Sequence, residues 1–240
     1  MKEIRKSTKE TVISFLKKQD DISKYGPYVG MCYNAMTHLK KYDGFEVSDD
    51  KIYERNYIIS LSYMMGKYDG KEEKMSGLIV GGDSNKYIFD ECIRTAINEV
   101  YKIKKTKEIL VFSTNYVAPD FVIHKNNRIK DINERNQKIV IESKTKDQLL
   151  PKEFFDDFFK LNVYLSRLKF RYGIYLLINT SVDRVNSFVG EYLKKDFFVS
   201  EKCKNRLLFL IQENKSVNPA LYVFKEDPKT YQLNTPRLTI

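Results

Sequence analysis

The sequence predicts an α/β fold in which helices flank a mixed β-sheet. Beyond about residue 84, apolar residues at helical spacing alternate with short β-branched runs. The run from Gly173 to Ile178 is apolar throughout, as in strands that are covered on both faces. The 240 residues are 42% hydrophobic, which is enough for one sizeable core.

The first part of the chain predicts a helical extension over residues 1–83, placed before a core of residues 84–240. The breaks at Gly26-Pro27 and Gly81-Gly82 interrupt its helical patterns. We expect this extension to contact the molecule on which the chain acts or to mediate dimerisation. Its three helices are expected at residues 1–19, about 28–41 and about 51–65.

The predicted core opens with a helix over residues 86–104. Its apolar residues, including Phe89, Ile93 and Val100, recur at helical spacing and should form the buried face. A polar connector is expected over residues 125–137. The strands around it are predicted at residues 109–112, 117–124 and 138–144.

A long helix is predicted over residues 151–170. Pro151 suits a first helical turn, and Phe and Leu residues recur behind it at helical spacing. A strand, a helix and two further strands should complete the core. They are predicted at residues 173–178, 183–195, 207–212 and 220–224.

The charge of the chain favours a polyanionic partner. The formal net charge is +10, and residues 86–240 carry 28 Lys and Arg against 19 Asp and Glu. Such an excess attracts polyanions and speeds their encounter, although many basic proteins bind no nucleic acid specifically.

Three cysteines at wide spacing, with no Cys-x-x-Cys pair, suggest neither a zinc site nor a disulfide framework. The amino-terminal residues contain no apolar run of the kind found in signal peptides. The longest apolar runs are only a few residues, so we expect no membrane span. A cytoplasmic location is the expectation that follows.

Two short motifs contain the candidate catalytic side chains. Pro119-Asp120 lies near the start of one predicted strand, and Glu142-Ser143-Lys144 closes the next, after a β-branched run. Side chains of a strand alternate between faces, so Glu142 and Lys144 should point the same way. The other Glu-x-Lys triplets of the chain lie in polar surroundings that are typical of loops or helix starts.

The motifs and the order helix, strand, strand, strand, helix, strand resemble the PD-(D/E)xK nuclease superfamily, to which many type II restriction endonucleases belong. The resemblance covers about residues 86–180. It implies a restriction-endonuclease-like core and a catalytic set of Asp120, Glu142 and Lys144. It also implies an Mg²⁺ ion, with Mn²⁺ as a substitute, bound by Asp120, Glu142 and the backbone carbonyl of Ser143.

Relatives in this superfamily often add an acid from the helix before the first strand. Glu91 is the candidate here, and Asp90 and Glu99 are weaker substitutes. Acids in a first helical turn also occur for reasons of the helix dipole alone.

Basic and amide side chains near the motifs are candidates for nucleic-acid contacts. One group lies in the polar connector, which is equally consistent with an exposed hairpin tip. A second follows the Glu-x-Lys motif, and a third shares one face of the long helix, which is equally consistent with a solvated basic face. The candidates are Lys125, Arg128, Lys130, Lys146, Gln148, Lys160, Tyr164 and Arg167.

The expected function is therefore Mg²⁺-dependent hydrolysis of phosphodiester bonds in double-stranded DNA, by a homodimeric type II restriction endonuclease. A repair, recombination or RNA nuclease on the same core stays open. For an RNA nuclease, His38 is the candidate upstream histidine ligand. A nucleic-acid-binding protein without catalysis is the non-enzymatic alternative.

Overall fold

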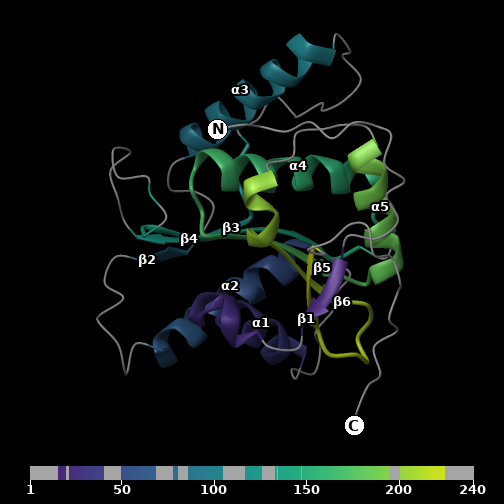
Figure 1. The fold of residues 1–240 in the computed structure, drawn as a ribbon. Coiled ribbons are helices and arrows are strands. Elements are labelled where there is room, and N and C mark those ends of the chain that lie inside the picture. Colours follow the sequence, from purple (N-terminus) through teal and green to yellow (C-terminus); the bar gives the residue numbers. More distant parts are fainter. Residues whose placement is uncertain are drawn as a thin grey trace.

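The computed structural model describes residues 16–19, 22–40, 50–68, 78–80, 86–104, 117–125, 133, 135–146, 148–194 and 201–224. Within them the chain forms three layers, with one β-sheet between two layers of helices (Figure 1). The α/β class and the mixed sheet flanked by helices, as the sequence predicted, are confirmed. None of the described helices is long and apolar enough to cross a membrane.

The sheet has seven strands in the order β1-β7-β6-β5-β4-β3-β2. The three central strands β4, β5 and β6 are parallel, and every other neighbouring pair is antiparallel. The strands are β1 (Leu16–Gln19), β2 (Leu78–Val80), β3 (Phe121–Lys125), β4 (Gln137–Lys144), β5 (Tyr172–Ile178), β6 (Leu207–Gln212) and β7 (Ala220–Phe224).

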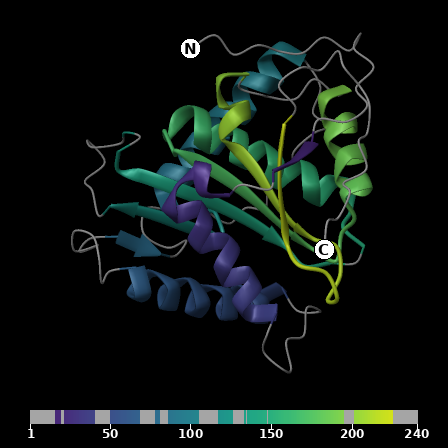
Figure 2. The ribbon, with the colours of Figure 1, turned by 60° about the horizontal axis from the view of Figure 1, so that its bottom comes forward.

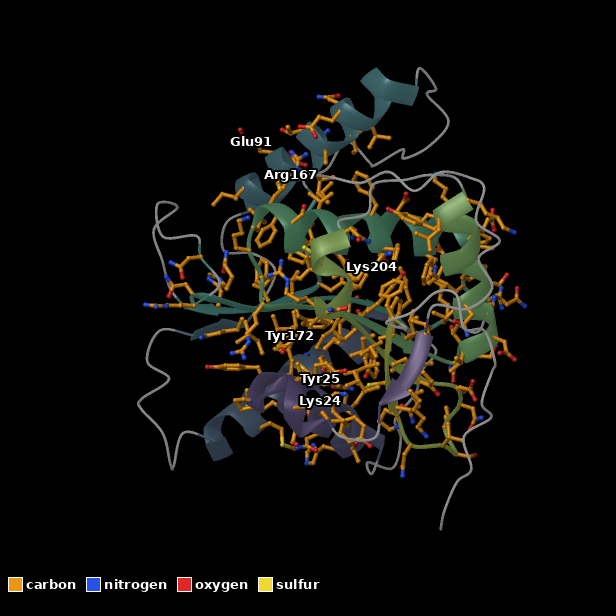
Figure 3. All side chains as sticks on the ribbon, in the orientation of Figure 1. Lys24, Tyr25, Glu91, Arg167, Tyr172 and Lys204 are labelled. Carbon is orange, nitrogen blue, oxygen red and sulfur yellow. The ribbon has the colours of Figure 1, made fainter. Side chains whose placement is uncertain are left out.

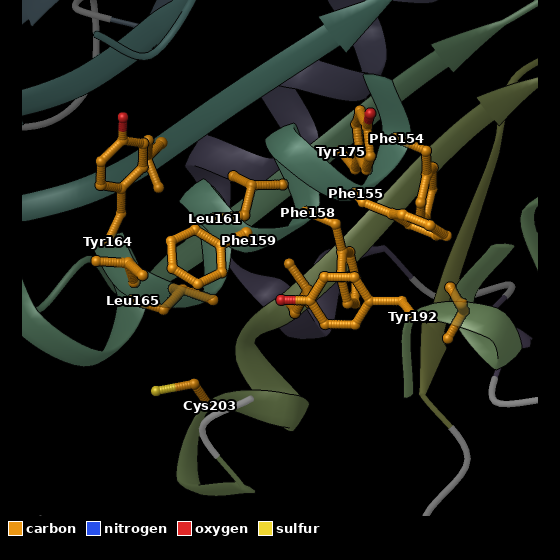
Figure 4. Packing of buried hydrophobic residues seen from close by; sticks show 14 of the residues in the cluster. Phe154, Phe155, Phe158, Phe159, Leu161, Tyr164, Leu165, Tyr175, Tyr192 and Cys203 are labelled. Carbon is orange, nitrogen blue, oxygen red and sulfur yellow. The ribbon is translucent and has the colours of Figure 1, made fainter. Parts of the chain in front are cut away.

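One face of the sheet is covered by three helices (Figure 1): α3 (Lys86–Lys104), α4 (Pro151–Arg167) and α5 (Val182–Lys194). Aromatic side chains fill this layer. Phe154 stacks on Tyr175 of β5, and Phe158 packs edge to face with Tyr192 of α5 (Figure 4). The dense aromatic packing fixes α4 against the sheet, which matters because α4 contributes to the site described below.

The other face is covered by α1 (Pro27–Lys40) and α2 (Asp50–Tyr68), which cross beneath the strands (Figure 2). Hydrogen bonds join the two helices: Tyr57 Oη donates to the carbonyl of Cys32 at 2.9 Å, and Ser60 Oγ donates to that of Ala35 at 3.2 Å. Two short 3₁₀ turns, η1 (Ser23–Tyr25) and η3 (Glu201–Arg206), precede α1 and β6.

Helices that the sequence placed in an extension over residues 1–83 pack directly on the sheet. Tyr57 of α2 contacts Phe121 of β3, and both lie in the hydrophobic cluster that α1 and α2 share with five of the strands. β1 and β2 are themselves strands of the same sheet. A role of this region in target contact or dimerisation stays a prediction.

Most predicted elements of the core lie where the pattern placed them. α3, β6 and β7 have the predicted bounds, and α4 ends at Arg167 rather than at residue 170. The turn that follows α4 contains Lys169 with a positive φ of 60°, which cannot continue a right-handed helix. The strand predicted at residues 109–112 lies outside the described residues.

In the first part of the chain, one prediction was wrong and one element was not predicted. The helix predicted over residues 1–19 lies outside the described residues up to residue 15, and Leu16–Gln19 form the edge strand β1, paired antiparallel to β7. Residues 78–80, for which the sequence predicted no element, form β2, paired with β3. Both are short edge strands whose conformation is set by hydrogen bonds to a distant partner, which a local pattern does not encode.

Candidate active site

The Glu142-Ser143-Lys144 motif closes β4 at its carboxyl end. Val140 lies in the hydrophobic cluster of α3, α4 and α5, and Ile141 lies in the cluster of α1 and α2. Because strand side chains alternate, Glu142 and Lys144 face the same layer as Val140. The motif therefore presents a carboxylate and an ammonium to α4.

Asp120 stands immediately before β3 and is tied to the motif. Phe121 pairs with Ile141 in the antiparallel ladder, so Asp120 lies beside the end of β4. The backbone N–H of Ser143 donates to Asp120 Oδ2 at 2.7 Å, and Ser143 Oγ donates to the same oxygen at 3.1 Å. These two bonds hold the Asp120 carboxylate next to Glu142.

The helix α4 adds Asp157 and Lys160, three residues apart and thus on one face. Lys144 Nζ lies 2.9 Å from Asp157 Oδ2, and Lys160 Nζ lies 2.7 Å from Asp157 Oδ1. Lys160 Nζ also lies 2.8 Å from Glu142 Oε2. We call the five side chains Asp120, Glu142, Lys144, Asp157 and Lys160 the charge cluster.

The charge cluster contains three carboxylates and two ammonium groups, so it carries one negative charge in excess when all are ionised. Burial raises the pKa of Asp120 and of Glu142, against the opposing pull of Lys160 on both. Burial by itself would raise the pKa of Asp157 too, but Lys160 and Lys144 lower it below its ordinary value. The uncompensated charge therefore rests on Asp120 and Glu142, where a proton or a cation would be favoured.

The oxygens at Asp120 and Glu142 fit a hard divalent cation. Glu142 is fully buried, and its Oε1 has no hydrogen-bond partner among the described residues. The N–H of Ser143 points toward Asp120, and in a strand the carbonyl of the same residue points to the same side. Two carboxylates and a carbonyl are the ligands that Mg²⁺ prefers.

No group of three or more His, Cys, Asp or Glu side chains in the described part of the chain is placed to hold a metal ion. This finding agrees with the charge cluster, because Asp157, the third acid, is already paired with two lysines. A cation at this site would thus depend on two carboxylates and on backbone or solvent oxygens.

A fourth acid, Glu54 of α2, approaches the same strand end from the other face of the sheet. Ser143 Oγ lies 3.3 Å from Glu54 Oε1, in a position to donate to either Glu54 or Asp120. Nothing in the sequence around Glu54 distinguishes it. Asp157 does have a signal, since it is an acid inside a run of buried aromatic residues and such an acid requires a cationic partner.

Glu91, the predicted additional acid, is exposed on the outer face of α3 (Figure 3). The structure does not bring it to the charge cluster. Its neighbour Asp90 accepts hydrogen bonds from the backbone N–H of Val117 at 3.0 Å and from Arg94 Nε at 2.7 Å. Asp90 therefore ties α3 to the segment that leads to Asp120. Glu99, the other substitute, pairs with Arg167.

Three of the candidate nucleic-acid contacts, on the face of α4, do not form the exposed basic face expected of them. Lys160 belongs to the charge cluster, and Tyr164 is fully buried in the α3–α5 layer with its hydroxyl unpaired among the described residues. Arg167 is only partly exposed and pairs with Glu99. These side chains face the sheet and α3, because the buried residues of α4 extend around most of its circumference.

The remaining candidates divide by position. Lys146 and Gln148 are exposed beside the motif, and Lys146 Nζ pairs with Glu153 Oε1 at 2.6 Å. Lys125 ends β3, with a side chain that is not among those described. Arg128 and Lys130 lie outside the described residues.

Comparisons with protein-family models, with curated proteins and with solved structures found no match. A functional assignment of this chain therefore depends on the geometry of the charge cluster.

Proposed function

We propose that the chain is an Mg²⁺-dependent endonuclease that hydrolyses phosphodiester bonds of double-stranded DNA, with a restriction-endonuclease-like core of the PD-(D/E)xK type. One observation carries the proposal: Asp120 is bonded to the backbone of the Glu142-Ser143-Lys144 motif at 2.7 Å. This bond gathers two carboxylates and an ammonium group at one strand end. A type II restriction enzyme acting as a homodimer is the specific form that we favour.

The order of the elements supports the proposal. Asp120 immediately precedes β3, the motif closes the antiparallel strand β4, and α4 then leads to β5, which is parallel to β4. This is the arrangement expected around the motif in that superfamily. The predicted first strand of the core, at residues 109–112, lies outside the described residues.

Asp120, Glu142 and the Ser143 carbonyl would hold the metal ion. A bound Mg²⁺ or Mn²⁺ supplies a Lewis acid for the phosphate and lowers the pKa of a coordinated water. Burial alone would lower the pKa of Lys144, but Asp157 and Asp120 raise it above its ordinary value. Lys144 therefore stays protonated, and its role is to donate to a phosphate oxygen that gains charge rather than to act as a base.

The test is cleavage of plasmid DNA by the purified chain with Mg²⁺, and with EDTA as the metal-free arm. We expect Asp120→Asn and Glu142→Gln to lower the cleavage rate by about 100-fold or more while DNA binding is kept. Asp183→Asn, at an exposed acid in the first turn of α5, is the matched control and should cleave normally. Wild-type chain that fails to cleave with Mg²⁺ or Mn²⁺ would refute the proposal.

A second candidate, a nucleic-acid-binding protein without catalysis, is favoured by one observation. Lys160 already pairs with Glu142 at 2.8 Å, in the place where a metal ion would bind. In exonuclease-like relatives the corresponding helix carries Gln and Tyr four residues apart, and here Lys160 stands in place of that Gln beside Tyr164. Metal binding by the wild-type chain separates the two candidates.

The RNA-nuclease alternative receives no support from His38. Its Nδ1 lies 3.1 Å from Ser60 Oγ, where it helps to join α1 to α2. These helices cover the face of the sheet opposite to the one that Glu142 and Lys144 present to α4. His38 therefore serves the packing of the helical layer.

A further inference from the structure

The edge of the sheet at which the parallel strands begin is basic. Ile139 of β4 pairs with Tyr172 of β5, and Gly173 pairs with Leu207 of β6, so the segments before these three strands lie together. Tyr25 joins them, with its ring edge to face with that of Tyr172 at 5.9 Å. We call six cations of these segments the basic edge: Lys24, Arg135, Lys138, Lys169, Arg171 and Lys204.

The described residues of these segments, 22–28, 133, 135–138, 168–172 and 201–207, contain one acid, Glu201 at the start of η3. Lys24, Arg135 and Arg171 are exposed. Glu91, which is exposed on α3 in the outer helical layer, lies above the edge in the view of Figure 3. Lys204, Tyr172, Tyr25 and Lys24 follow one another below, along the same view of the molecule (Figure 3). A concentration of one sign of charge on this scale attracts polyanions.

Tyrosine rings hold three of these cations in place. Lys24 Nζ lies 5.2 Å from the centre of the Tyr25 ring, and the Arg171 guanidinium lies 5.7 Å from that of Tyr172. Lys138 Nζ lies 5.4 Å from the Tyr28 ring. An aromatic ring restrains a cation without cancelling its charge, so less side-chain entropy is lost when an anion binds.

We propose that the basic edge binds the sugar-phosphate backbone of nucleic acid at a distance from the bond that is cut. The edge and the candidate active site lie at opposite ends of β4. Lys138 and Lys144 are six residues apart in that strand, which corresponds to about 20 Å. This proposal deepens the proposed function and shares its choice of polymer, but it requires neither a metal ion nor cleavage.

The experiment measures binding of the full chain to fluorescent duplex DNA in EDTA, over a range of salt concentrations. In the test variant, Lys24→Gln and Arg171→Gln remove one Lys and one Arg from the edge. The matched control, Arg55→Gln with Lys215→Gln, removes the same charges from exposed positions on α2 and in the turn after β6. A further variant, Lys24→Arg with Arg171→Lys, keeps the charge of the edge.

We expect the test variant to bind on the order of tenfold more weakly at about 0.15 M salt, with a salt slope smaller in magnitude by about 1.8 for two lost phosphate contacts. The control and the charge-keeping variant should bind as the wild type does. Thermal unfolding of each variant shows whether it is folded.

Equal binding by the folded test variant and the control would overturn the proposal. So would tighter association of the edge with phosphatidylserine vesicles than with DNA, which would make it a membrane-binding surface. These outcomes can be distinguished from those of the proposed function. A chain that binds DNA through this edge but never cleaves it would refute the proposed nuclease function and leave the binding proposal intact.

Discussion

Glu142 is the residue on which the chemistry of the site depends. It is fully buried, one of its oxygens is bonded to Lys160, and the other has no hydrogen-bond partner among the described residues. A buried carboxylate in this condition is costly unless a cation comes close. Lys160 is the cation that the chain itself provides, and a metal ion would have to share the carboxylate with it.

Replacing Lys160 tests this competition. In Lys160→Gln the cluster loses one of its two ammonium groups, so Glu142 and Asp157 are left with more negative charge. We expect the metal-free variant to be destabilised, by about 3–5 kcal/mol if the pair behaves as other broken buried pairs do. We expect Mn²⁺ to raise its melting temperature more than that of the wild type, because the freed carboxylate binds the ion.

The matched control is Lys146→Gln, which breaks the more exposed pair with Glu153 at the same strand end. It should change neither the stability nor the response to Mn²⁺ by much. Calorimetric titration with Mn²⁺ provides the direct measurement. An unchanged affinity in Lys160→Gln would mean that Lys160 serves only to hold α4 against the sheet.

Glu54 and Glu91 offer a second test at the scale of single residues. Glu54 lies 3.3 Å from Ser143 Oγ, whereas Glu91 is exposed on α3. Glu54→Gln should lower metal affinity about 10-fold or more, as expected for a group that orients a ligand. Glu91→Gln should leave it unchanged. The opposite result, with Glu91 required and Glu54 dispensable, would restore the prediction made from the sequence.

The residues of the site differ in how far the sequence could predict them. Asp120 and the Glu142-Ser143-Lys144 motif stand at strand ends, where alternation and proximity along the chain are informative. Asp157 and Lys160 reach the motif only because α4 packs across it, and Glu54 because α2 packs on the opposite face. Such convergence depends on tertiary packing, which a single sequence does not encode locally.

Among the elements, α4 and β5 approach each other closely at Gly173. A Cβ at this position would lie 3.1 Å from Leu165 Cδ1 and 3.2 Å from Leu165 Cγ. In contrast, a Cβ at Gly30 in α1 would meet nothing within 4 Å. Of the two glycines, only Gly173 is therefore needed to leave space for a neighbouring helix.

Substitution at these glycines should move stability in opposite directions. Gly173→Val should destabilise the chain by about 1–3 kcal/mol, because the added methyl groups force Leu165 and α4 outward. Gly30→Ala should stabilise it by about 0.5–1 kcal/mol through helix propensity. Urea denaturation monitored by circular dichroism measures both. A Gly173→Val chain as stable as the wild type would show that α4 is not packed tightly on β5.

Elements with a clear apolar pattern of their own could be predicted from the sequence, whereas the short edge strands β1 and β2 could not. α3 has its buried residues at helical spacing, and its bounds agree with the prediction. β1 owes its conformation to four paired residues of β7, which lie about 200 positions further along the chain. The local pattern there predicted a helix instead, because Val12, Phe15 and Leu16 recur at helical spacing.

At the scale of the molecule, two groups of charged residues in its described part lie at opposite ends of the parallel strands. The basic edge lies where β4, β5 and β6 begin, and the charge cluster with its excess negative charge lies where β4 ends. A polyanion would be drawn to the first end, whereas a cation would be drawn to the second. The excess negative charge of the charge cluster also makes the stability of the fold depend on pH.

Glu142 and Asp120 have raised pKa values in the folded chain, so folding favours their protonated forms. Their contribution to stability is present below their unfolded values and is lost as the pH rises through the folded ones. Asp157, whose folded pKa is lowered, contributes in the opposite sense and loses its contribution at acidic pH.

Glu142→Gln removes the excess charge and leaves two carboxylates with two ammonium groups. In EDTA this variant should therefore melt above the wild type at neutral pH, by about 2–4 °C for each kcal/mol gained. The difference should shrink as the pH falls toward about 4.5, because the wild-type carboxyl is then protonated. Mg²⁺ should reverse the order at neutral pH, since only the wild type keeps both carboxylates for the ion. Melting curves from pH 4.5 to 8, with and without Mg²⁺, measure both effects. A difference that does not vary with pH would place the excess charge somewhere other than at Glu142.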